Sequence, residues 1–265
     1  MPFVDSNDAR IHYQLTGPEQ APVIVLIHSL GANLHMWDPL VAHLGSSFRH
    51  LRYDLPGHGE SSIPAVPYGI DQLGSDLVAL LDHLGVAQAN ICGLSIGGLI
   101  AMWLGLYAPA RVRKLILANT AARIGSVASW EQRIEQVERE GMAALAQTTP
   151  ERWFTEAYRR AHPEEMAAVS NMVAATNRTG YLGCCAVLRD TDLSQAIAAI
   201  TKPTLVITGT HDTATPLADG RNLWTAIAGS RLVELGTSHI SAWERPEQFA
   251  QVVTDFLNSK EPHHG

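Results

Sequence analysis

Short apolar segments alternate with helical patterns over most of the 265-residue chain. Each apolar segment is long enough for one buried strand, and leucines at helical spacing between residues 73 and 84 mark one face of an amphipathic helix. Such alternation is typical of βαβ units and predicts an α/β fold, with a mostly parallel central sheet flanked by helices. The predicted strands are residues 11–15, 23–27, 48–53, 89–92, 114–118, 204–208 and 231–235.

The first two strands are expected to pair as an antiparallel hairpin around Thr16-Gly17-Pro18. The alternation stops between residues 122 and 195, where apolar residues recur only at helical spacing. A helical insertion after a strand of a parallel sheet lies over the carboxyl ends of the strands, where ligands bind in open α/β folds. Breaks between its helices are expected at Thr149-Pro150, His162-Pro163 and Thr179-Gly180. The predicted domains are a core of residues 1–121 and 196–265 and a helical cap, or lid, of residues 122–195.

Charge and composition limit the partners. The net charge of −7 argues against a surface that binds nucleic acid or anionic membranes. No run of about 18 apolar residues predicts a membrane span. The first six residues have neither the basic nor the apolar region of a signal peptide, so we expect a cytoplasmic protein; the oligomeric state stays open. The last residues, Pro262–Gly265, are expected to be a disordered tail.

The three cysteines do not form the spaced framework of a secreted protein. Cys184 and Cys185 are adjacent, a spacing at which a relaxed mutual disulfide is geometrically difficult, and Cys92 lies in a predicted buried strand. We interpret all three as reduced and mostly buried thiols. The alternative, metal ligation by Cys184 and Cys185, lacks the accompanying Cys-x-x-Cys or paired histidine spacing, so no metal site is predicted.

The most informative motif is Gly93-Leu94-Ser95-Ile96-Gly97, which has the Gly-x-Ser-x-Gly pattern of a nucleophile elbow. The motif lies between a predicted strand and a predicted helix, and this context makes the short pattern specific. Larger residues in place of the two glycines would crowd the sharp turn. We therefore predict that Ser95 is a nucleophile exposed at the N-terminus of a helix, whose amides favour developing negative charge.

A serine nucleophile needs a base and a group that orients the base. In folds with such an elbow, the three residues follow one another along the chain in the order serine, acid, histidine. Asp212 follows the strand at 204–208 and His239 follows the strand at 231–235, so both emerge at the same sheet edge as Ser95. His211 is the nearest rival for the base, but it precedes the acid. The end of the strand at 114–118 is a second possible place for the acid, but it carries Asn119.

Asp54 and His58 lie in a glycine-containing turn after an earlier strand, and we interpret them as structural. An oxyanion hole is expected from two backbone amides, that of Ile96 after the nucleophile and that of Leu30 in His28-Ser29-Leu30-Gly31. His28 is expected to hold this loop by hydrogen bonding rather than to do chemistry. Such a triad needs no cofactor.

These segments resemble the α/β-hydrolase superfamily in order along nearly the whole chain. A narrower similarity is to the 3-oxoadipate enol-lactonases of aromatic catabolism. The segments that carry it are residues 119–126 with Trp130 and Arg133, Arg152-Trp153-Phe154, Gly209–Asp212 through Thr215-Pro216, and Ser238–Ser241. The implied substrate is an anionic lactone, 3-oxoadipate enol-lactone, which is hydrolysed to 3-oxoadipate in the β-ketoadipate pathway.

The carboxylate of that substrate calls for a cation in the pocket. Arg133 is the candidate, because no acidic residue stands three or four positions away on its helix; the alternative is an exposed or otherwise paired arginine. Trp130, Trp153 and Phe154 either line the pocket or pack the cap on the core. Other readings of the triad are a general carboxylesterase, a carbon–carbon bond hydrolase and a ligand-sensing receptor of the same fold. A serine at the elbow argues against dehalogenases and epoxide hydrolases, which use aspartate there.

Overall fold

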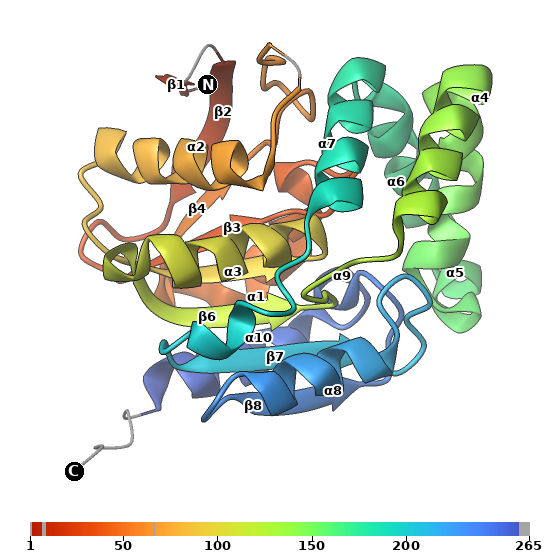
Figure 1. Ribbon diagram of the computed structural model, residues 1–265. Coiled ribbons are helices and arrows are strands. Elements are labelled where there is room, and N and C mark those ends of the chain that lie inside the picture. The colour runs from red at the N-terminus through yellow and green to blue at the C-terminus, as the bar shows by residue number, and fades with distance from the viewer. Residues whose placement is uncertain (1, 7–8, 66, 260–265) are drawn as a thin grey trace.

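An eight-stranded sheet forms the centre of the computed structural model, which describes residues 2–6, 9–65 and 67–259 (Figure 1). The strand order is β1-β2-β4-β3-β5-β6-β7-β8. The six strands from β4 to β8 are parallel, and β1 and β2 add an antiparallel edge. The strands are β1 (Phe3–Ser6), β2 (Ala9–Thr16), β3 (Val23–Ile27), β4 (Arg49–Tyr53), β5 (Ala89–Leu94), β6 (Val112–Ala118), β7 (Thr204–Gly209) and β8 (Arg231–Leu235).

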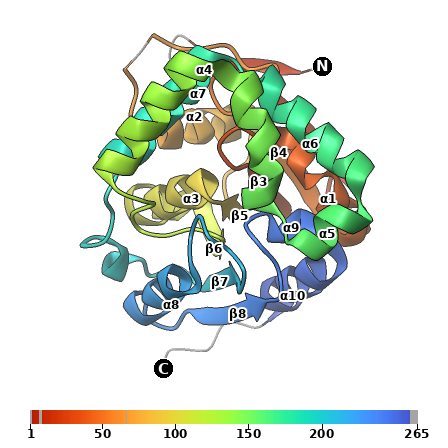
Figure 2. The same cartoon turned by 90° about the vertical axis from the view of Figure 1, so that its right-hand side faces the viewer.

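Helices cover both faces of the sheet. Figure 2 shows α2, α3 and α8 on one side and α1 and α10 on the other. Every residue of β5 and of β7 is therefore buried, as expected for central parallel strands, whose sequences are continuously apolar. The helices outside the segment between β6 and β7 are α1 (Asp38–Leu44), α2 (Ile70–His83), α3 (Ile96–Tyr107), α8 (Leu217–Ala226), α9 (Ser241–Glu244) and α10 (Pro246–Asn258).

The predicted hairpin between the first two strands is wrong. β2 pairs with β1 and β4, and β4 lies between β2 and β3. The loop after β2 crosses the start of β4 so closely that a Cβ on Gly17 would lie 2.5 Å from the carbonyl oxygen of Phe48. Gly17 has a φ of 100°, which allows this crossing, and β3 can then insert on the far side of β4. The prediction also missed β1. The tail at Pro262–Gly265 lies outside the described residues.

Between β6 and β7 the chain forms four helices, and residues 122–195, all of them described, contain no strand. They lie over the carboxyl ends of the parallel strands (Figures 1 and 2). These helices are α4 (Val127–Trp153), α5 (Glu156–Ala161), α6 (Pro163–Ala175) and α7 (Arg178–Asp190).

Only one of the three predicted breaks in this segment is found, that at His162-Pro163 between α5 and α6. Thr149-Pro150 lies in the last turns of α4, and the helix continues to Trp153 although Pro150 lacks the N–H that would bond the carbonyl four residues earlier. Thr179-Gly180 lies inside α7. The actual interruption of α4 is at Gly141, whose φ of 77° and ψ of 175° are not helical. α4 is thus two helical pieces that meet at an angle set by one glycine.

Candidate active site

Ser95 occupies the turn between β5 and α3 with φ of 60° and ψ of −121°. A non-glycine residue in such a conformation costs about 1–3 kcal/mol and is typical of functional sites. Close approach explains the flanking glycines. A Cβ on Gly93 would lie 2.0 Å from the carbonyl oxygen of Gly97, and a Cβ on Gly97 would lie 2.3 Å from that of Ile27. The steric reason that the sequence analysis gave for both glycines is confirmed.

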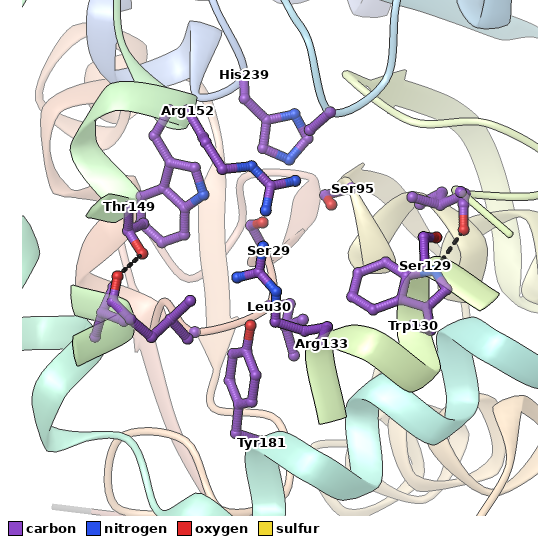
Figure 3. Close-up of a pocket in the computed structure, with 17 residues that line it drawn as sticks. Ser29, Leu30, Ser95, Ser129, Trp130, Arg133, Thr149, Arg152, Tyr181 and His239 are labelled. Carbon is purple, nitrogen blue, oxygen red and sulfur yellow. Dashed lines mark hydrogen bonds between the residues drawn. The ribbon is translucent and has the colours of Figure 1, made fainter. Parts of the chain in front are cut away.

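His239 and Asp212, which follow β8 and β7, meet at the same end of the sheet. Nδ1 of His239 lies 2.8 Å from Oδ2 of Asp212, and both side chains are buried. His239 and Ser95 line one cavity, and Figure 3 shows the imidazole and the hydroxyl facing it. The structure therefore brings the three predicted triad residues together, each at the carboxyl end of a different strand.

Asp212 is held by five hydrogen bonds. Besides the bond to His239, its Oδ2 accepts from the Thr215 hydroxyl (2.7 Å) and from Nδ2 of Asn119 (3.0 Å), and its Oδ1 accepts from the amides of Ala214 (2.8 Å) and Thr215 (3.0 Å). Burial alone would raise the pKa of Asp212. The charge of His239 and these hydrogen bonds outweigh burial and hold this pKa well below its usual range. A carboxylate held in this way favours the ionised form and hydrogen-bonds the imidazole of His239.

The rival candidates lie elsewhere. His211 is exposed and is not among the residues that line the cavity. Asp54 is buried, and its Oδ2 lies 2.7 Å from Nδ1 of His12 while its Oδ1 accepts from the amide of Leu34 (2.8 Å). It is surrounded by the turn that follows β4, where a Cβ on Gly59 would lie 2.1 Å from its Oδ2. These contacts agree with the structural interpretation of Asp54.

The two expected oxyanion donors, the backbone amides of Leu30 and Ile96, belong to the loop after β3 and to the start of α3. Leu30 lines the cavity, and Ile96 is the first residue of α3. Among the described residues, neither amide donates a hydrogen bond to another group of the protein. The Ser29 carbonyl accepts from Nδ1–H of His28 (2.8 Å), and that carbonyl shares a peptide plane with the Leu30 N–H. Because the two groups of a trans peptide point in opposite directions, His28 fixes the direction of the Leu30 amide.

A second histidine braces the same loop. Nε2 of His58 accepts from the Gly31 amide (3.0 Å), and its Nδ1–H donates to the Pro56 carbonyl (2.9 Å). Nε2 of His28 likewise accepts from the Leu55 amide (2.9 Å), so each ring donates through Nδ1 and accepts through Nε2, which requires the neutral imidazole. Both rings are completely buried. Burial lowers the pKa of His28, and burial together with His28 lowers the pKa of His58 to about 3.

These histidines predict acid sensitivity of the fold. Since they stay neutral in the native state while the unfolded chain binds protons below its own pKa of about 6.5, the free energy of unfolding should fall as pH falls, by about 1.4 kcal/mol per pH unit for each histidine. Urea unfolding at pH 7, 6 and 5 measures this slope. His58→Gln, whose amide can donate to Pro56 and accept from Gly31, should have a shallower slope. Equal slopes in both proteins would contradict this assignment.

Two arginines share the cavity of about 180 Å³ beside Ser95. Figure 3 shows the guanidinium groups of Arg133 and Arg152, both from α4, pointing into it. Arg133 and the Tyr181 hydroxyl line the same cavity, and burial and the charge of Arg133 lower the pKa of Arg152. Within the described part of the chain, neither guanidinium has an acidic partner within ion-pair distance. The cavity therefore carries positive charge that its own walls do not neutralise.

The predicted aromatic residues divide between the cavity and the contact of the helical segment, residues 122–195, with the rest of the chain. Trp130 and Trp153 line the cavity, and Nε1 of Trp130 donates to the Ile124 carbonyl (2.6 Å). Phe154 is 1% exposed and is not among the lining residues. Its ring stacks on Tyr158 (5.4 Å between centroids) and meets Trp243 edge-on (6.1 Å). Phe154 thus packs the helical segment on the core and does not fit the predicted role in substrate binding.

Three further expectations concern other sites. All three cysteines are buried and free. In residues 2–6, 9–65 and 67–259, no cluster of three or more histidine, cysteine or acidic side chains is arranged to hold a metal ion. Over the same residues, no helix has the length and apolar character needed to cross a membrane.

Comparison with known proteins places this geometry in a family. Residues 22–246 match the family described as the alpha/beta hydrolase fold. The chain belongs to this family. The α/β-hydrolase described here is also 40% identical over 248 residues to 3-oxoadipate enol-lactonase 2 of Acinetobacter baylyi, which covers 94% of this chain and 93% of that protein. It is 37% identical to enol-lactonase 1 of the same organism, over 93% of this chain and 92% of that protein.

A solved structure agrees with these relatives. The enol-lactonase from Burkholderia xenovorans LB400 superposes on this α/β-hydrolase with a TM-score of 0.95 at 44% identity, covering 97% of this chain and 100% of that one. The fold class and the resemblance to the enol-lactonase family are confirmed. Arg152 was quoted only as part of the resembling segment and was missed as a pocket cation. The criterion applied to Arg133 does not find Arg152, because Glu156 stands four positions after it in the sequence.

Proposed function

We propose that this α/β-hydrolase is a carboxylic ester hydrolase that opens the ring of 3-oxoadipate enol-lactone to give 3-oxoadipate, a step of the β-ketoadipate pathway. One observation carries the proposal: a serine–histidine–aspartate constellation opens into the same small cavity as two unneutralised guanidinium groups. The relatives named for this lactone are similar over nearly the whole chain, which supports the same substrate.

The charges in the cavity match this substrate. Arg133 and Arg152 contribute two positive charges, and none of the residues that line the cavity is acidic, so a substrate carboxylate would find guanidinium partners there. Charge-assisted hydrogen bonds from guanidinium groups to a carboxylate are among the stronger polar contacts in proteins. The side-chain carboxylate would bind between Arg133, Arg152 and the Tyr181 hydroxyl, and this would direct the lactone carbonyl toward Ser95.

The reaction follows the general course of serine hydrolases. Ser95 attacks the lactone carbonyl while His239 accepts its proton, and the amides of Leu30 and Ile96 stabilise the oxyanion. Collapse of the intermediate breaks the ring carbon–oxygen bond. The leaving enol takes the proton from His239 and tautomerises to the ketone. Water, deprotonated by His239, then hydrolyses the acyl-enzyme and releases the 3-oxo dicarboxylate.

Steady-state kinetics with three esters tests the proposal: the acid lactone, its methyl ester and p-nitrophenyl acetate. We expect kcat/KM above about 10⁴ M⁻¹s⁻¹ for the acid lactone, in the usual range for enzymes. The methyl ester should be a much poorer substrate because it lacks the charge that the arginines bind. Faster turnover of the neutral esters would instead support a general carboxylesterase. Ligand binding with little turnover would support a receptor, and cleavage of diketone acids a carbon–carbon bond hydrolase.

Arg133→Ala should separate charge recognition from chemistry. Loss of a hydrogen bond to a charged group costs about 1.5–3 kcal/mol, so kcat/KM for the acid lactone should fall about 10–100-fold. For the methyl ester, kcat/KM should fall less than about 3-fold, because this substrate has no carboxylate for Arg133 to bind. Arg139→Ala is the matched control, because Arg139 is exposed and pairs with Glu140. Equal losses on both substrates would mean that Arg133 does not bind the carboxylate.

The segment of residues 122–195 would act as the cap that encloses the substrate, since it supplies both arginines and covers the strand ends that carry the triad. We place the reaction in the cytoplasm, where the three buried free thiols would stay reduced.

A further inference from the structure

Glu244 is a buried acidic residue at the end of α9 that touches both the His239 loop and the helical cap. It is 5% exposed. Its Oε2 accepts from the backbone amide of Ser238 (2.9 Å), the residue directly before His239. Its Oε1 accepts a short hydrogen bond from the hydroxyl of Thr155, and the Thr155 amide lies 3.4 Å from both oxygens. One carboxylate thus joins the loop that carries His239 to the segment that begins α5.

The link through Glu244 is one of three between the same segments. The Ser238 hydroxyl donates to the carbonyl of Arg152 (3.2 Å), and the Ile240 amide donates to the carbonyl of Trp153 (3.0 Å). The residues on both sides of His239 are therefore bonded to the stretch of cap backbone that carries a pocket arginine and a pocket tryptophan. A shift of this stretch would move the histidine loop with it.

Hydrogen bonds alone hold the Glu244 carboxylate. Over the described part of the chain, no lysine, arginine or histidine nitrogen lies within ion-pair distance of it. A buried carboxylate without a cation is costly unless its donors are well placed, and charge-assisted bonds from N–H and O–H groups are stronger than neutral ones. Both oxygens are needed as acceptors, one for the loop and one for the cap, which an amide in this position could not supply.

We propose that Glu244 is a positioning residue that couples the cap to the catalytic base, so that binding of a substrate carboxylate by the cap arginines places His239 for proton transfer. This inference rests on the proposed hydrolase function. It predicts that the link matters most for substrates that engage Arg152. A small displacement of a catalytic group lowers turnover steeply, and the effect should be seen in kcat more than in KM.

Two variants cut the link on different sides. Thr155→Val removes the short hydroxyl bond to Glu244 and leaves only the 3.4 Å contacts from the amide of residue 155, while the bond from Ser238 to Glu244 stays intact. It also removes the oxygen that caps α5, so the melting temperature of this variant is measured together with its kinetics. Glu244→Gln keeps one acceptor oxygen and replaces the other by a donor, so one side must lose its partner. Glu247→Gln is the matched control, because it makes the same change at an exposed position three residues further along.

The substrates are the enol-lactone and two aryl esters that differ in one carboxylate, p-nitrophenyl acetate and p-nitrophenyl hydrogen succinate. For Thr155→Val, kcat should fall about 10-fold on the anionic ester and the lactone but less than about 2-fold on the acetate. Glu244→Gln should lower kcat on all three, and the anionic substrates most. The variant that combines Thr155→Val with Glu244→Gln should have the same kcat as Glu244→Gln alone, because both substitutions act on the same link.

A merely structural role would lower the melting temperature and affect neutral and anionic esters equally, and that result would overturn the proposal. So would wild-type kcat in both variants. If the wild-type protein hydrolyses the ester pair but not the lactone, the proposed substrate fails while the coupling is still measured. Hydrogen–deuterium exchange adds an independent check, since Glu244→Gln should increase exchange at residues 152–155 and 238–240 together. Faster exchange confined to α9 would contradict the coupling.

Discussion

Ser95→Ala should lower kcat for the lactone by about 10⁴-fold or more, because loss of the nucleophile removes the covalent route and leaves only binding and the oxyanion hole. The variant should fold normally. Alanine at φ of 60° is strained to a similar degree as serine, and the Ser95 hydroxyl donates no hydrogen bond to another described residue. Steady-state kinetics and a melting curve measure the two effects.

A second pocket serine supplies the control for this experiment. Ser29 is 2% exposed and lines the same cavity, but its position is not an elbow. Ser29→Ala keeps the carbonyl that His28 binds, so kcat should change by less than about 10-fold. Near-wild-type turnover by Ser95→Ala would refute the serine mechanism. Equal losses in both variants would point to a disturbed cavity rather than a lost nucleophile.

The sequence predicts best the central strands of the sheet, because helices cover both of their faces. β5 and β7 are buried on both faces, so each is mainly apolar, with Asn90 in β5 and Thr204 and Thr208 in β7 as the polar exceptions. The pairing of β2 was not predictable in the same way. Neighbours in sequence pair by default, and only the crossing of Gly17 over Phe48, a long-range contact, separates β2 from β3.

The meeting of the three proposed triad residues was predictable because backbone position alone brings them together. Ser95, Asp212 and His239 each follow the carboxyl end of a strand, and these ends share one sheet edge. The placement of the residues near the end of α4 depends instead on the direction of each side chain. Arg152 and Trp153 face the cavity, whereas Phe154, at φ of −132° and ψ of 148°, leaves the helix and turns away.

The break in α4 at Gly141 could likewise not be predicted from the local sequence pattern. Helical periodicity assumes a continuous helix, and the non-helical torsion angles of Gly141 redirect the half that carries Arg152 relative to the half that carries Arg133. The convergence of the two arginines on one cavity therefore follows from tertiary structure and is not encoded in their spacing.

Asn119 shows how a residue that was set aside contributes to the site. It follows β6, the second possible place for the acid, and has a φ of 44°. Its Nδ2 donates to Oδ2 of Asp212 (3.0 Å) and to the carbonyl of Ser238 (3.1 Å), and its Oδ1 accepts from the Ser241 hydroxyl (2.5 Å). The position that could have held the acid thus supplies a donor that keeps Asp212 ionised.

Asp212→Asn should therefore lower kcat far more than the loss of one charge at a surface site would. Oδ2 of Asp212 accepts from the hydroxyl of Thr215, from Asn119 and from the imidazole, while Oδ1 accepts from two amides. An amide group would have to turn a donor toward one of these sets of donors. Whichever side it faces, the imidazole loses either its orientation or the counter-charge for the imidazolium, and kcat should fall about 10⁴-fold.

Asp219→Asn is the control for this variant. Burial, and then the charge of Asp212, raise the pKa of Asp219, so it is a nearby acid in the same electrostatic environment that does not touch His239. Its kcat should stay within about 3-fold of wild type, as expected for a group outside the triad. Asn119→Ala removes one of the donors to Oδ2 of Asp212. Its kcat should be about 10-fold below wild type, between the values for Asp219→Asn and Asp212→Asn. If Asp212→Asn kept a tenth of the activity, the imidazole would need another acid, and the constellation at the end of β7 would be a structural network rather than the third member of a triad.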